Sequence, residues 1–120
     1  MKIAISATGK NNSSLIDMRF GRCEYFQIHD VESGEIKIIK NEGQMASGGA
    51  GIAAAQQVID AGADVVITGN LGPNAYRVLK SAEIKAFKVT NIPVEAGIRA
   101  YKECQLTEIS TPGKAHQGML

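Results

Sequence analysis

The chain has 120 residues, a formal net charge of +1, 44% hydrophobic residues, three Phe, three Tyr and no Trp. This length predicts one domain, with a core built mainly from Ile, Val, Leu and Ala. The near-neutral charge argues against a nucleic-acid-binding surface, and no apolar run approaches the roughly 20 residues of a membrane span. The two cysteines form no CxxC pair and the chain opens directly on a strand-like pattern, so we expect a cytoplasmic protein with free thiols.

The first third of the chain is strand-like. Residues 2–7 predict a buried strand, and residues 24–31 and 35–40 alternate apolar and polar side chains. Ser33-Gly34 is a turn signal between the last two segments, which we therefore expect to form an antiparallel hairpin. Between the first and second strands lies a long loop, residues 8–22, whose first part, residues 8–14, has a loop composition.

The rest of the chain alternates helical and strand-like patterns up to about residue 106. The expected elements are a helix over 50–61, a strand over 64–68, a helix from Pro73, a strand over 84–89 and a helix from Pro93. Gly62 stands where a cap for the first of these helices belongs. From Thr107 the pattern is lost, so we expect a domain over 1–106 and a flexible tail over 107–120.

This order of elements limits the topology. Strand–helix–strand connections are right-handed, so strands 3, 4 and 5 run the same way, while the hairpin makes strand 2 antiparallel. A five-stranded mixed α/β sheet in the order 3-2-1-4-5, with helices on both faces, satisfies these constraints. That order is typical of the ribonuclease H-like architecture. The loops after strands 1, 3, 4 and 5 then emerge at one edge, where open α/β sheets bind ligands.

Three loops at this predicted edge run directly into helix starts: residues 46–51, 69–73 and 90–93. A helix start carries unpaired N–H groups and a partial positive charge, and glycine lets a ligand approach the backbone closely. If the three starts gather, the edge attracts anions. The residues that we expect to bind such a ligand through these loops are Gly48, Gly49, Gly69, Asn70 and Gly72.

The loop between the first two strands would bring cationic side chains to the same edge. Lys10, Arg19 and Arg22 lie in it, and the guanidinium groups could form an anion clamp with Cys23 as a soft metal ligand. The alternative is structural: Phe20 packs under the loop, the arginines pair with neighbouring carboxylates, and Cys23 is a small core residue. The glycine spacing before Lys10 does not fit a phosphate loop.

Evidence for catalysis is weak in the sequence. Strand 1 has no acidic residue, although metal-dependent nucleases of this architecture need one there. His29 fits a surface histidine of the hairpin, with Asp30 or solvent as its partner, and no hydrolase triad is evident. His116, near the C-terminal end, could reach over the edge as a flexible metal ligand.

Four segments together resemble the dinitrogenase iron–molybdenum cofactor biosynthesis family, which includes the small carrier NifX and the C-terminal region of NifB. They are residues 1–5 (MKIAI), 17–26 (DMRFGRCEYF), 48–53 (GGAGIA) and 69–75 (GNLGPNA). The resemblance extends to about residue 105 and implies the ribonuclease H-like fold.

The resemblance implies binding rather than catalysis, because nitrogenase members of the family hold anionic iron–sulfur cofactor precursors. It implies a cluster ligand at Arg19, Arg22 and Cys23, with cofactor-biosynthesis proteins as partners. The chain lacks the Cys/His-rich tail of some relatives and keeps only His116 there. We therefore expect a non-catalytic carrier of an iron–sulfur or iron–molybdenum cluster. The alternatives are a regulatory binder of a phosphate- or carboxylate-bearing metabolite, a metal-dependent hydrolase and an interaction module.

Overall fold

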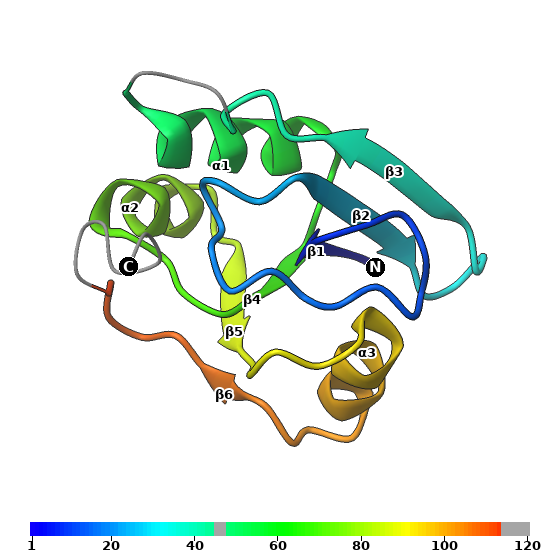
Figure 1. Cartoon of the computed structure of the whole chain (residues 1–120). Helices are drawn as coiled ribbons and strands as arrows, with labels where there is room; N and C mark the ends of the chain where they lie inside the picture. Colours follow the sequence, from blue (N-terminus) through cyan, green and yellow to red (C-terminus); the bar gives the residue numbers. More distant parts are fainter. Residues whose placement is uncertain (45–47, 114–120) are drawn as a thin grey trace.

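The computed structural model describes residues 1–44 and 48–113. Figure 1 shows one mixed sheet with helices on both faces. The strands are β1 (Lys2–Ala7), β2 (Tyr25–Asp30), β3 (Ile36–Lys40), β4 (Val65–Thr68), β5 (Lys85–Lys88) and β6 (Thr107–Glu108). The helices are α1 (Ala50–Asp60), α2 (Pro73–Ser81) and α3 (Val94–Lys102).

The sheet has six strands in the order β3-β2-β1-β4-β5-β6, so the predicted order of the first five strands is confirmed and the predicted number is wrong. β1 pairs antiparallel with β2 and parallel with β4, and β5 continues the parallel part. The ribonuclease H-like assignment stays a prediction. Every residue of β4 is buried, which is why its sequence is a continuous apolar run ending in a threonine.

β6 corrects the predicted domain boundary at residue 106. Its two residues pair antiparallel with Phe87 and Lys88 of β5. The chain that follows is also bonded, because the Tyr76 hydroxyl donates to the Ser110 carbonyl at 2.6 Å and the Gly113 N–H donates to the Leu71 carbonyl at 2.7 Å. These bonds use mostly backbone groups, so no side-chain period marks the segment. Residues 114–120, in the rest of the predicted tail, lie outside the described residues.

The two faces of the sheet carry separate cores. α1 and α2 lie side by side over one face, where Ala54, Val58 and Leu79 pack on Phe26 of β2 and its neighbours (Figure 1). α3 covers the opposite face, where Val94 packs with Ile3, Ile5 and Ile67. No helix of the described residues is both long and apolar enough to cross a membrane.

A buried polar pair on β2 holds the first part of the long loop. The Gln27 amide nitrogen donates to the carbonyls of Gly9 (3.0 Å) and Asn11 (2.8 Å), so its oxygen accepts from His29 Nε2 at 2.9 Å. His29 is therefore a buried residue with Gln27 as its partner, which corrects the expectation of a surface histidine. Burial and, to a smaller extent, the positive charge of Lys102 lower the pKa of His29.

The second part of this loop crosses the carboxyl edge of the sheet, in front of β1 and β4 in Figure 1. Ile16 is buried in the core under α3, whereas Phe20 is buried in the core under α1 and α2, 5.1 Å from the Phe26 ring between centroids. Between them the Asp17 N–H donates to the Ser6 carbonyl at 2.8 Å. The loop is therefore anchored on both sides of the sheet and lies across the edge at which open α/β sheets bind ligands.

We predict that Gly69→Ala destabilises the fold by about 1–3 kcal/mol, because overpacking forces the backbone to shift. A Cβ at Gly69 would lie 2.6 Å from Met18 Cα, which cannot move without the loop. The control is Gly48→Ala, where a Cβ would meet no described atom within 4 Å and the change should stay below about 0.5 kcal/mol. Urea unfolding measures both, and equal midpoints would contradict the prediction.

Candidate anion-binding site

The starts of α1 and α2 are open, with the features that anion binding needs. Gly49 and Gly72 occupy their N-cap positions, and neither helix has a side-chain cap or an acidic residue in its first turn. Gly49 has φ 71°, a left-handed conformation that favours glycine. The first N–H groups of both helices, with the positive end of each helix dipole, therefore lack a compensating side chain among the described residues.

The start of α3 differs, which corrects the expectation of three anion-attracting starts. Its first two N–H groups, on Val94 and Glu95, donate to the carbonyls of Ser14 (2.9 Å) and Asn12 (3.0 Å) in the long loop. Glu95 also adds a negative charge to its first turn. The start of α3 therefore holds the long loop in place, and its first two N–H groups already donate to carbonyls of that loop.

Close backbone packing brings the loop and the two open helix starts together. A Cβ at Gly21 would lie 3.1 Å from the Gly51 nitrogen, and one at Gly51 would lie 3.3 Å from Ala75 Cβ. Gly21 belongs to the Arg-Phe-Gly-Arg segment, Gly51 to α1 and Ala75 to α2. We call this surface the rim. It comprises residues 19–22, 48–52 and 72–75.

The predicted glycines divide into open and closed positions. A Cβ at Gly48, Gly49 or Gly72 would meet no described atom within 4 Å, so a ligand can reach the backbone there. Gly69 is buried under Met18 and serves packing, not binding. Asn70 is half-buried beside it, one residue before Leu71.

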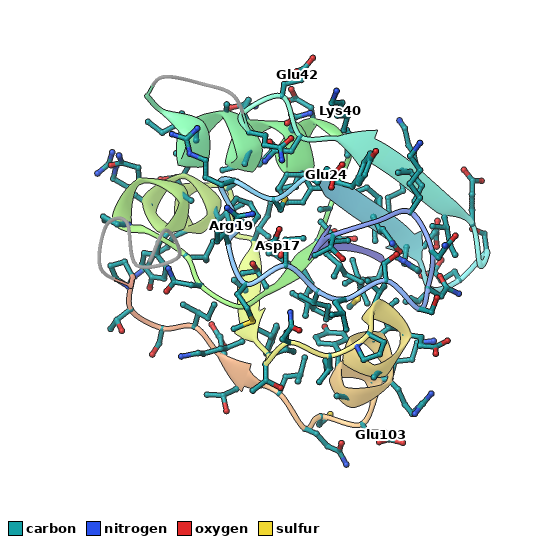
Figure 2. The ribbon with its side chains drawn as sticks, viewed as in Figure 1. Asp17, Arg19, Glu24, Lys40, Glu42 and Glu103 are labelled. Carbon is teal, nitrogen blue, oxygen red and sulfur yellow. The ribbon has the colours of Figure 1, made fainter. Side chains whose placement is uncertain are left out.

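Arg19 lies on the rim in an ion pair with Asp17 (Figure 2). Asp17 Oδ1 accepts from the Arg19 backbone N–H at 2.9 Å and from its Nε at 3.3 Å, and Oδ2 accepts from Nη2 at 3.5 Å. The Arg19 side chain is 43% exposed while that of Asp17 is 9% exposed. Arg19 thus pairs with a neighbouring carboxylate, as the structural alternative predicts, but its guanidinium group still reaches solvent.

Arg22 is fixed to the loop that leads into α1. Its Nη1 donates to the Gln44 carbonyl at 2.9 Å. The buried Asn41 ties the same two loops together, because its amide nitrogen donates to the carbonyls of Gly21 (3.0 Å) and Cys23 (2.8 Å) while its oxygen accepts from the Gly43 N–H (2.9 Å). Arg22 is therefore held beside the α1 start by two loops that are themselves bonded to each other.

Cys23 is completely buried in the core under α1 and α2, as the structural alternative expects. Burial, with a smaller contribution from the negative charge of Asp17, raises the pKa of its thiol far above the ordinary range. A protonated thiol is a poor metal ligand, so the position of Cys23 does not fit the predicted role at the rim. The described residues also contain no group of three or more His, Cys, Asp or Glu side chains that could hold a metal ion.

Two other predicted residues stand apart from the rim. The Lys10 ammonium lies 5.4 Å from the centre of the Tyr25 ring, and Tyr25 pairs with Ala7, whose side chain belongs to the core under α3. Lys10 is thus on the face opposite to α1 and α2. His116, the second predicted metal ligand, lies outside the described residues.

Sequence reasoning missed the residues that hold the rim in place. Asn41 directly follows a predicted strand and Met18 lies in the long loop, and neither position carries a functional signal in the sequence. Asn41 could have been found as a turn-forming residue directly after a strand. The contact of Met18 with Gly69 joins segments 51 residues apart in sequence, so no local pattern indicates it.

The comparison with protein families decides the relationship. Residues 1–104 match the family described as dinitrogenase iron-molybdenum cofactor. The chain belongs to this family. It is also 33% identical over 109 residues to an uncharacterized protein of Methanocaldococcus jannaschii, covering 88% of this chain and 89% of that one.

Solved structures of similar chains agree with this family membership. The apo form of the orange protein from Desulfovibrio gigas superposes with a TM-score of 0.90 at 33% identity, covering 94% of this chain and 96% of that one. A NifB-like protein from Thermotoga gives a TM-score of 0.83 at 33% identity, covering 95% and 97%. The family and the arrangement of the chain are thus both established, and they point to iron–molybdenum cofactor biosynthesis or binding.

We predict that iodoacetamide labels the native protein once, at Cys104, and labels it twice after unfolding. Cys104 is exposed, whereas Cys23 is buried and its raised pKa leaves almost no reactive thiolate near neutral pH. Mass spectrometry of intact protein counts the labels, and Cys104→Ser is the control that should take none when native. Rapid labelling of Cys23 in folded protein would mean that the loop opens.

Proposed function

We propose that this protein is a non-catalytic carrier that binds an anionic iron–sulfur or iron–molybdenum cofactor precursor on the rim. Membership of the dinitrogenase iron-molybdenum cofactor family supports this class of cargo. The rim supplies backbone N–H donors and two guanidinium groups, which are the groups that stabilise anions without proton transfer.

One observation carries the proposal: the two uncapped helix starts converge on the Arg-Phe-Gly-Arg segment. A Cβ at Gly21 would lie 3.1 Å from the Gly51 nitrogen, which belongs to the first turn of α1. The two arginines of the segment, on either side of Gly21 in sequence, therefore lie beside the start of α1. Two helix dipoles and two guanidinium groups attract an extended anion more strongly than a single helix start does.

The mode of binding follows from the donors. Because Cys23 is buried and protonated, we infer that the cargo keeps its own inner ligands and is recognised through its outer, negatively charged atoms. Such a carrier can take up and release a preassembled cluster without breaking protein–metal bonds. Its partners would be the cytoplasmic cofactor-biosynthesis proteins that make and receive the cluster.

A second candidate is a regulatory binder of a phosphate- or carboxylate-bearing metabolite. It is favoured by the same donor set, because N–H and guanidinium groups bind oxyanions as readily as metal sulfides. A metabolite should raise the melting temperature in air without metal. A screen in which only such compounds stabilise the protein would favour this function over the carrier.

The test is anaerobic incubation of the purified protein with a cluster preassembled from ferrous iron and tetrathiomolybdate, followed by gel filtration. We predict that visible absorbance co-elutes with wild-type protein near stoichiometric amounts. In Arg22→Ala the retained chromophore should fall about five- to tenfold, since loss of a charge-assisted contact costs on the order of 1–1.5 kcal/mol.

The matched control is Arg99→Ala, which removes the same group from the last turn of α3, at the other end of the helix from the edge. It should retain the wild-type amount. The carrier function is excluded if wild-type protein retains no chromophore, and the rim is the wrong location if Arg99→Ala and Arg22→Ala lose equal amounts.

A further inference from the structure

The carboxylate of Asp17 lies next to the cationic side chain of Arg19 on the rim, where its negative charge does not favour the binding of an anion. Asp17 lies two residues before Arg19 and next to the crossing point of the loop over β1. Its carboxylate accepts three hydrogen bonds, and all three come from Arg19. A negative charge in this position opposes the binding of a second anion to the same guanidinium.

Asp17 is held rigidly. Its carbonyl accepts from the Ser6 hydroxyl at 2.8 Å, and the Ser6 hydroxyl oxygen lies 2.7 Å from Thr68 Oγ1, which therefore donates to it. Ser6 and Thr68 are completely buried. The carboxylate is held as well, because its Oδ1 accepts from the Arg19 backbone N–H at 2.9 Å and the Asp17 side chain is only 9% exposed.

The ion pair itself is loose. Its contacts at 3.3 and 3.5 Å exceed the 2.7–2.9 Å of strong charge-assisted bonds, and the Arg19 side chain is half-exposed. The guanidinium can therefore turn toward a ligand, but only by giving up its side-chain contacts with the carboxylate, which stays beside it.

We propose that Asp17 is a counter-charge residue that limits the affinity of the rim for anions by competing for Arg19, so that bound cargo can be released. This inference rests on the proposed function. Removing the carboxylate leaves Arg19 wholly available to the ligand and removes a repulsive charge from its vicinity, so affinity rises instead of falling.

The experiment compares wild type with Asp17→Asn in an anaerobic titration with the same preassembled iron–thiomolybdate cluster, which gives the affinity. Asparagine keeps an oxygen that can accept from the Arg19 N–H, while it removes the charge and replaces the oxygen that faces Arg19 Nη2 with an amide NH2 group. Affinity should rise about three- to tenfold, the scale of one unit charge at a solvated site. The gain should shrink as salt is added.

The control is Glu103→Gln, which makes the same change in net charge at the end of α3, away from the loop that carries Asp17 (Figure 2). Its affinity should match wild type. A second variant, Asp17→Ser, retains a side-chain oxygen for the same N–H and should show the same gain, which protects the test against a folding defect in one variant. Circular dichroism and urea unfolding check that both are folded.

A double variant separates competition for Arg19 from general repulsion. With Arg19→Gln present, Asp17→Asn should give a much smaller gain because no guanidinium is released. An unchanged or lower affinity in both folded Asp17 variants overturns the inference while the Arg22→Ala result leaves the carrier function standing. Failure of wild type to bind the probe removes both.

Discussion

The close backbone contact between the Arg-Phe-Gly-Arg loop and the first turns of α1 and α2 is the constraint on which the site depends. It requires residues without side chains at Gly21 and Gly51, because a Cβ at either would come within 3.3 Å of its neighbour. Other van der Waals contacts and hydrogen bonds could fix the loop in a different position. The contact between Gly21 and Gly51 is what places the arginines beside the two open helix starts. The concentration of positive charge on the rim therefore depends on the close packing at Gly21 and Gly51.

The loop is also why the sheet edge is not an ordinary open crevice. It carries Ile16 into one core and Phe20 into the other, so its path over the strands is fixed from both faces of the sheet. Gln27, Asn41 and the start of α3 donate to five further carbonyls of the loop, those of Gly9, Asn11, Asn12, Ser14 and Gly21. A rigid loop of this kind preorganises donors, which lowers the entropy lost when a ligand binds.

Much of the fold could be predicted from the sequence because its signals are local. Alternation in the hairpin, the buried run of β4 and the proline at the α2 start each define an element, and crossover handedness then orders the strands. β6 escaped prediction because two residues give no period. The roles of Cys23 and of the α3 start depend on contacts with distant segments, Asn41 and Ser14 among them. The sequence indicates that these groups could bind a ligand, but it does not show which of them already bond to another part of the chain.

The most direct measurement of the central claim is a titration of the protein with molybdate, followed by the backbone amide signals in NMR spectra. Molybdate is diamagnetic and carries the oxyanion chemistry that N–H and guanidinium donors recognise. We expect the amide signals of Gly49, Gly51 and Asn74, and the side-chain N–H signals of Arg19 and Arg22, to shift together, while the amide signals of Val94 and Glu95 stay in place. Shifts centred on the α3 start, or spread evenly over the surface, would contradict it.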